Sequence, residues 1–119
     1  MIDALIEKWT VQLRKGILEL IILAALAEKE RYGFELIGTL RDDTALEMPE
    51  GTIYPLLTRL AGDRLIAAEW RDSGSGPPRK YYRLSDRGRQ ALERMVDGWR
   101  QLAGSVSVMI GAGNYAVQR

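Results

Sequence analysis

The sequence predicts a mainly α-helical protein with one small β-hairpin (α+β), arranged as a winged helix-turn-helix with a long C-terminal dimerisation helix. Three observations predict it: apolar residues recur at helical spacing in four segments, two strand patterns flank a turn-rich loop, and the last helix has a near-heptad stripe. We expect residues 1–84 to form the winged domain, with its first helix contributing to the dimer. Residues 85–111 would form the dimerisation helix and 112–119 a flexible tail.

Composition is that of a globular protein with one domain. The chain has 119 residues, 46% of them hydrophobic and 28% charged, with a net charge of +1. Its longest apolar run, residues 17–27, is interrupted by Glu19 and is shorter than the roughly 20 residues of a membrane span. Histidine and cysteine are absent, which removes disulfides, most metal sites and most nucleophile–base pairs. We therefore expect a cytoplasmic protein that is not an enzyme and has no metal, cofactor or membrane contact.

The first helical pattern runs from residue 3 to about residue 29. Its first half is amphipathic, with Leu5, Trp9 and Leu13 on one face. Its second half, residues 18–26, is apolar on nearly all sides. We therefore expect neighbouring helices to bury the second half.

A charged turn over residues 28–31 separates this helix from a second one over residues 32–40. The turn alternates acids with bases, which is the pattern of a solvated loop. In the second helix Phe34, Ile37 and Leu40 recur at helical spacing, and we expect them to face the core.

A third helix is predicted to open at Pro49 or Glu50, where a missing N–H is harmless and an acid meets the positive helix end. Its segment, residues 51–60, has one apolar stripe and a far face that is small, hydroxylic or basic. A helix that meets phosphates and base edges needs such a face, although a solvated surface helix has one too. The apolar stripe contains Ile53, Leu56, Leu57 and Leu60, and the far face contains Thr52, Pro55, Thr58, Arg59 and Gly62, with Tyr54 on the flank.

Two strand patterns follow the third helix. Residues 65–71 alternate, with Ile66, Ala68 and Trp70 on one side, and residues 79–84 are rich in β-formers. A loop of glycine, serine and proline joins them, and the return strand opens with two cations. A helix-turn-helix followed at once by a basic hairpin is the order of a winged helix, in which Trp70 would belong to the hairpin core.

The last helix is predicted from Ser85, its cap, to about Gly111. Apolar residues recur along it in a near-heptad seam of about three repeats. Such a seam needs a partner helix, most simply from a second copy of the chain. We expect the dimer contact to include Leu92, Met95, Val96, Trp99, Leu102 and Val106, with Leu5 and Trp9 of the first helix.

Four segments in this order resemble the PadR family of bacterial transcriptional regulators, and the likeness runs from about residue 13 to residue 110. The single long C-terminal helix is similar to the shorter subfamily. The resemblance implies a homodimeric winged helix-turn-helix that binds a pseudo-palindromic operator in double-stranded DNA. It also implies repression, often of a detoxification, efflux or stress gene, and often with release by a small molecule. The segments are LRKGILE at 13–19, YGFEL at 32–36, GTIYPLLTRL at 51–60 and RKYYRLSDRG at 79–88.

The residues that we expect on DNA come from three elements. The third helix would enter the major groove, where Thr52 at its start would donate to a phosphate. The wing would contact the backbone or minor groove, and the first helix would touch flanking phosphates. The set is Thr52, Tyr54, Pro55, Thr58 and Arg59 from the third helix, Arg79 and Lys80 from the wing, and Arg14 and Lys15 from the first helix.

Two of these residues have an alternative structural role. Tyr54 either reaches a phosphate or base edge or packs beneath the wing. Arg59 either reads guanine or only pairs with Asp63, four residues further along the chain. The pattern alone leaves both alternatives open.

Trp99 also has two alternatives. Either it fills the dimer contact, or it and its symmetry mate line an apolar slot for planar compounds. Trp9 and Met95 would lie beside it, and Gly98 would leave room. Some drug-sensing members of the family that the chain resembles have a tryptophan at the matching place. An aromatic or hydrophobic effector in this slot would rotate the two wings and disturb their fit to DNA.

A winged-helix module that binds protein and not DNA is the alternative function. It predicts that DNA retention has no steep dependence on salt. It also predicts that retention hardly changes when Arg59 or Lys80 is replaced by alanine.

Overall fold

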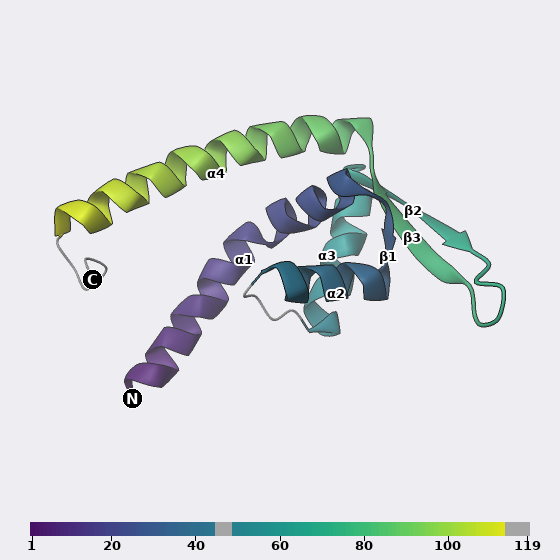
Figure 1. Cartoon of the computed structure of the whole chain (residues 1–119), viewed down its shortest axis with the longest axis horizontal. Coiled ribbons are helices and arrows are strands. Elements are labelled where there is room, and N and C mark those ends of the chain that lie inside the picture. The colour runs from purple at the N-terminus through teal and green to yellow at the C-terminus, as the bar shows by residue number, and fades with distance from the viewer. Residues whose placement is uncertain (45–48, 114–119) are drawn as a thin grey trace.

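The computed structural model describes residues 1–44 and 49–113, and the predicted tail from residue 114 onward lies outside them. In the described part, three helices pack together, a hairpin projects from one end, and the first and last helices diverge toward the other end (Figure 1). This arrangement confirms the mainly helical winged helix-turn-helix. The elements are α1 (Ile2–Glu28), β1 (Arg31–Tyr32), α2 (Gly33–Asp43), α3 (Glu50–Gly62), β2 (Ile66–Arg71), β3 (Arg79–Leu84) and α4 (Asp86–Gly113).

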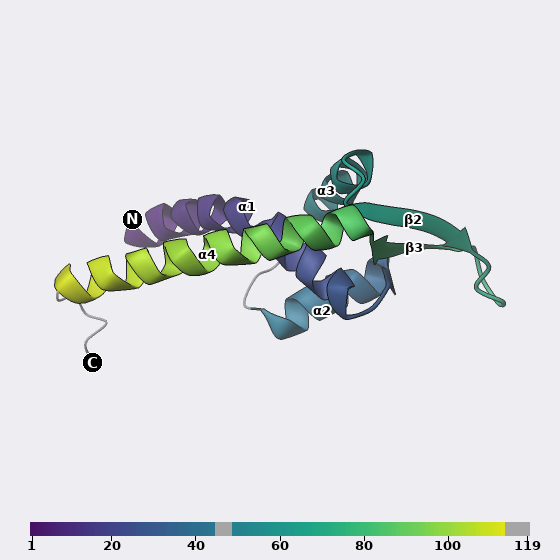
Figure 2. The same ribbon diagram turned by 90° about the horizontal axis from the view of Figure 1, so that it is seen from above.

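The hydrophobic core lies where α1, α2 and α3 meet the base of the hairpin. The second half of α1 is its centre, as predicted, whereas the first half extends away from it. Seen from above, α4 runs along the length of the molecule, with α2 and α3 on opposite sides of it (Figure 2). The buried core residues are Leu18, Ile22, Leu23, Leu26, Leu36, Leu40, Ile53, Leu57, Leu60, Ile66 and Tyr82.

The inner face of α2 differs from the prediction at one position. Phe34 is 68% exposed, whereas Gly33, Leu36 and Leu40 are buried and Ile37 is half-buried. Positions 33, 36 and 40 satisfy helical spacing as well as 34, 37 and 40 do, so periodicity could not choose between the two faces. The expectation that Phe34 faces the core is therefore wrong.

The predicted solvated turn at residues 28–31 contains a buried cation. Arg31 is 6% exposed and lies in β1. Its guanidinium donates to the Ala25 carbonyl at 3.2 Å, to Thr39 Oγ1 at 3.0 Å and to Glu28 Oε1 at 2.7 Å. These bonds join the end of α1 to α2 and satisfy the buried charge.

The sheet has three antiparallel strands in the order β1-β3-β2. The hairpin pairs β2 with β3 from Ile66 opposite Leu84 to Arg71 opposite Arg79. At the far end, Arg71 forms two hydrogen bonds with Glu30, of 2.5 and 3.0 Å. This donation lowers the pKa of Glu30, so the carboxylate stays charged and ties the wing to the turn after α1.

The start of α4 is anchored to Leu65, the residue just before β2. Ser85 caps the helix as predicted, because its Oγ accepts the Gly88 N–H at 3.0 Å. The Ser85 N–H donates to the Leu65 carbonyl at 3.1 Å. Gly88 is buried so closely against this carbonyl that a Cβ at Gly88 would lie 1.9 Å from the Leu65 oxygen. The helix continues to Gly113, two residues beyond the predicted end.

Candidate nucleic-acid interface

The outer face of α3 is exposed along its length. Thr52, Pro55, Thr58 and Arg59 all reach solvent, while the apolar stripe of the same helix is buried. The Thr58 hydroxyl donates to the Tyr54 carbonyl at 3.1 Å, which leaves its oxygen lone pairs facing outward. This face thus combines hydroxyls and a guanidinium on a rigid helix, which suits contact with phosphates and base edges.

Arg59 has an ion-pair partner that the sequence did not identify. Its guanidinium pairs with Glu19 of α1, and the side chains are 60% and 38% exposed respectively. The alternative that Arg59 only pairs with Asp63 is therefore wrong. Asp63 is the C-cap of α3, where its backbone N–H donates to the Arg59 carbonyl at 3.0 Å.

Tyr54 lies half-buried between α3 and the start of α2. A Cβ at Gly33 would lie 2.4 Å from the Tyr54 phenol oxygen, so the two residues meet closely. Burial raises the pKa of Tyr54, and the Glu50 carboxylate raises it further, so the phenol stays neutral and can donate a hydrogen bond. Tyr54 therefore packs against α2 in the free chain while its ring borders the groove beside the wing.

The two wing cations lie over aromatic rings. Arg79 Cζ is 4.5 Å from the centroid of the Tyr32 ring, and Lys80 Nζ is 5.6 Å from that of Trp70. Neither cation forms an ion pair with the described residues. Because a ring orients a cation without neutralising its charge, both remain able to bind a phosphate.

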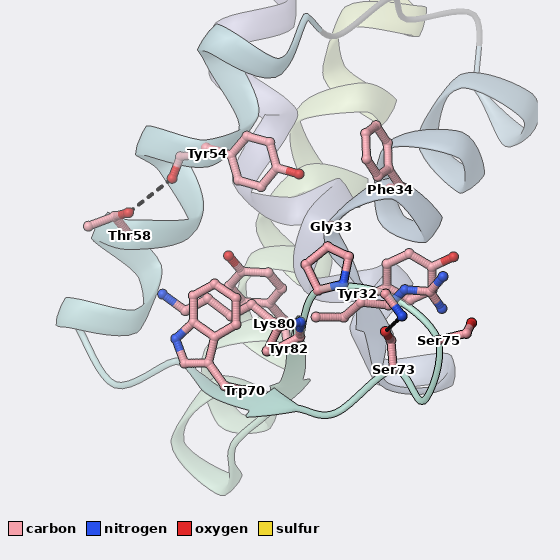
Figure 3. Close-up of a pocket in the computed structure, with 14 residues that line it drawn as sticks. Tyr32, Gly33, Phe34, Tyr54, Thr58, Trp70, Ser73, Ser75, Lys80 and Tyr82 are labelled. Atoms are coloured by element: carbon pink, nitrogen blue, oxygen red, sulfur yellow. Dashed lines mark hydrogen bonds between the residues drawn. The ribbon is translucent and has the colours of Figure 1, made fainter.

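A groove of about 720 Å³ separates α3 from the wing, and the start of α2 forms its third side (Figure 3). Among the described residues, its lining carries the two wing cations and no carboxylate. Trp70 is 65% exposed, so its predicted place in the hairpin core is wrong: the hairpin extends beyond the helices that would have covered it. The aromatic side chains that line the groove are Tyr32, Phe34, Tyr54, Trp70 and Tyr82.

Arg14 and Lys15 lie on α1, about one turn before Glu19. Lys15 is exposed, whereas Arg14 is half-buried and its Nε has no hydrogen-bond partner among the described residues. Both cations are therefore separate from the groove and stand on the helix that pairs with Arg59.

Two apolar stripes are left uncovered by the residues that the structure describes. One lies on the first half of α1 and one on the second half of α4, where the two helices diverge (Figure 1). Of the predicted seam residues, Leu92 and Met95 pack against the chain's own core and Val96 is half-buried. The exposed members of the predicted contact are Leu5, Trp9, Trp99, Leu102 and Val106.

A cavity of about 460 Å³ lies between α1 and α4 where they begin to separate. Trp99 and Met95 line it from α4, and Leu13 and Ile17 line it from α1. Trp9, expected beside Trp99, is not among its lining residues, because α1 has diverged from α4 at that level.

Residues 1–44 and 49–113 contain neither a candidate metal site nor a candidate membrane-spanning helix. This part of the chain contains no cluster of three acidic or other ligating side chains that could hold a metal ion. None of its helices is both long enough and apolar enough to cross a bilayer.

Comparison with known proteins decides the family. The family model of the transcriptional regulator PadR-like family matches residues 22–94. The chain belongs to the PadR-like family. An uncharacterized protein from Lysinibacillus sphaericus is similar to it, at 33% identity over 90 residues, which is 74% of this chain and 83% of that protein.

Solved structures of PadR regulators are similar over most of the chain. The PadR family transcriptional regulator from Eggerthella lenta is 34% identical with a TM-score of 0.82, over 91% of this chain and 94% of that one. The PadR-like transcriptional regulator from Bacillus cereus is 36% identical with a TM-score of 0.75, over 83% of this chain and 96% of that one. This PadR-like protein is thus a DNA-binding transcriptional regulator and not an enzyme.

Three residues that border the PadR-like interface were missed from the sequence. Phe34 was assigned to the interior from its helical spacing and Trp70 from the alternation of its strand, and both are exposed. Glu19 was treated only as an interruption of an apolar run. A single carboxylate in an otherwise buried helix was a usable signal, because such a group needs a cationic partner nearby.

Proposed function

We propose that this PadR-like protein is a homodimeric repressor that reads its operator with α3 and holds the adjacent DNA backbone with its wing. The observation that carries the proposal is the groove between these elements. Tyr54 and Thr58 of α3 line it together with two cations that form no ion pair with the described residues, and its described lining contains no carboxylate, whereas Thr52 and Arg59 lie on α3 outside the groove. Phosphates are attracted to such a surface and base edges can be read beside it.

The duplex in this proposal lies with α3 in its major groove. Thr52 donates to a phosphate at the positive end of the helix, and Arg59 faces the base edges. Arg79 and Lys80 bind the neighbouring backbone, and the exposed rings of Phe34 and Trp70 lie against deoxyriboses. Arg14 and Lys15 of α1 face flanking phosphates.

The dimer in this proposal forms through the two uncovered stripes. An exposed apolar patch of this kind is typical of an interaction site. A two-fold contact between α4 helices, covered by the first half of each α1, would bury Trp9, Trp99, Leu102 and Val106. It would also hold two copies of α3 roughly 34–36 Å apart, as successive major grooves require.

We further propose that a planar apolar compound relieves repression by binding beside Trp99. The cavity between α1 and α4 supports this, because Trp99 and Met95 line it and the partner copy would close it. A compound there would change the angle between the two winged domains. Coupling of this kind is typically about 1–3 kcal/mol.

The operator is first identified by sequencing the fragments of genomic DNA that the wild-type protein retains. The affinities of Arg59→Ala and Lys80→Ala for this operator then test the DNA contacts. We expect each variant to bind the operator at least about tenfold more weakly than wild type. Loss of the Lys80 phosphate contact should also reduce the slope of log affinity against log salt by about 0.9.

The matched control for these variants is Arg94→Ala, because Arg94 is exposed on α4, on the side opposite the seam. It removes the same charge and should change affinity by less than about twofold. If wild-type binding has no salt slope and all three variants behave alike, the protein-interaction alternative is favoured.

The effector site is tested by tryptophan fluorescence. We expect planar aromatic compounds to quench wild-type emission at saturating, stoichiometric binding, because a stacked ring would contact Trp99 directly. Trp99→Ala should bind the same compounds at least about tenfold more weakly, and Trp70→Ala should bind them unchanged. If no compound binds, or binding is the same in Trp99→Ala, the slot hypothesis is wrong.

A further inference from the structure

Glu19 is the only charged residue within residues 17–27 of α1. Its neighbours Leu18 and Ile22 are buried in the core, but its own side chain is 38% exposed and pairs with Arg59. Arg59 belongs to the face of α3 that we assign to DNA. A carboxylate on a different helix therefore binds the guanidinium that the operator is proposed to contact.

We infer that Glu19 is a positioning residue that holds Arg59 in the unbound protein and must release it before Arg59 contacts the operator, so that the ion pair limits operator affinity. The inference rests on the proposed function. It assigns a new role to a side chain outside the DNA-facing surface.

Competition for one guanidinium gives the physical basis. While Arg59 is paired with Glu19 its charge is neutralised, and it releases no counterion on meeting an arbitrary phosphate. An exposed ion pair is weak, so a bidentate contact with a guanine edge can displace it. A wrong sequence offers no such contact and leaves the pair in place. The operator contact therefore bears the cost of breaking the pair, and this cost disappears when Glu19 is replaced.

The position of Glu19 also links two parts of the molecule. Gly16, Ile17 and Leu20, on either side of Glu19 in α1, line the cavity that contains Trp99. Asp63, although close to Arg59 in sequence, does not replace Glu19 because it caps the end of α3. A displacement of α1 relative to α3 would therefore change how firmly Arg59 is held.

The experiment measures affinity for two duplexes over a series of salt concentrations. One duplex has mixed sequence and the other is the operator selected from genomic DNA. The proteins are wild type, Glu19→Gln, Arg59→Ala and the double variant. Glu7→Gln is the matched control, because Glu7 is exposed on α1 and has no ion pair with the described residues.

We expect Glu19→Gln to bind the operator about threefold to fivefold more tightly than wild type, because the Arg59 contact no longer has to break an ion pair. Affinity for the mixed-sequence duplex should rise less, because the released Arg59 gains only a phosphate contact there, and its salt slope should steepen by about 0.9 at most. In the Arg59→Ala background the Glu19 substitution should have no effect, because there is no guanidinium left to release. Glu7→Gln should leave both affinities unchanged.

A gain that persists without Arg59 would mean simple repulsion of phosphate by Glu19 and would overturn the inference, as would a larger gain on the mixed-sequence duplex than on the operator. A wild type that binds DNA and an unchanged Glu19→Gln would overturn it too. A wild type without salt-dependent DNA binding would instead overturn the proposed function.

A second measurement needs no substitution at Glu19. Nuclear magnetic resonance of the Arg59 Nη2 protons, which lie at the ion pair, should show slow exchange in the free wild-type protein and with mixed-sequence DNA. On the operator the resonance should shift as the partner changes. Arg59 Nη2 protons that exchange freely in the unbound protein would contradict the inference, whatever the folding of the variants.

Discussion

Replacing Gly88 by alanine is expected to lower the free energy of unfolding by about 3 kcal/mol. The added Cβ would lie 1.9 Å from the Leu65 oxygen and 2.7 Å from Leu84 Cδ1. The first contact is with backbone, which cannot move aside as a flexible side chain can. That carbonyl also accepts the Ser85 N–H, so its displacement would disturb the start of α4. The measurement is the midpoint of urea unfolding followed by circular dichroism.

Gly104→Ala is the matched control, because Gly104 belongs to the same helix and has no atom within 4 Å of an added Cβ. It lies on the side of α4 opposite the seam. Glycine inside a helix is less stable than alanine by roughly 0.5–1 kcal/mol, so this variant should gain stability. Gly88 does not pack closely against Leu65 if both variants shift the midpoint of unfolding in the same direction by similar amounts.

Replacing Leu102 by glutamate is expected to abolish the dimer at micromolar concentration and with it tight binding to the operator. Leu102 is 59% exposed in the single chain and lies beside Trp99 on the cavity wall. In the proposed dimer the substitution removes about 1.5–3 kcal/mol of apolar burial from each copy and places an unpaired charge in the contact. Operator affinity should fall at least about a hundredfold, because one reading helix would bind alone.

Gln101→Glu adds the same charge one residue earlier, on the outer side of α4, where Gln101 is exposed. It should leave the mass in solution and the operator affinity nearly unchanged. A Leu102→Glu protein that remains a dimer with wild-type affinity would show that the α4 stripe is not the contact.

Much of the fold could be predicted because its elements are long and periodic. α1, α3 and α4 each repeat an apolar spacing over several turns, and the hairpin has two strand patterns joined by a turn-rich loop. β1 could not be predicted, since two residues are too few to show alternation. The burial of Arg31 could not be predicted either, because it depends on three acceptors that converge only in the folded chain.

Features of the candidate site that depend on a single helix or strand could be predicted from the sequence. Features that depend on how separate elements pack together could not. The exposed face of α3 follows from its own spacing, as do the two cations that open β3. The exposure of Trp70 depends on how far the hairpin extends beyond the helices. The pairing of Arg59 with Glu19 depends on how α1 crosses α3. The number of residues between two positions does not indicate how far the hairpin extends or how α1 crosses α3.

Recognition of a two-fold operator depends on the dimer, because one chain supplies only a single copy of α3 and one wing. Sedimentation velocity of the purified wild-type chain tests for this dimer most directly. We expect one species with twice the 13.4 kDa mass of the chain at micromolar concentration. A single stable species of 13.4 kDa under these conditions would contradict the account, because the stripes on α1 and α4 would then have no partner.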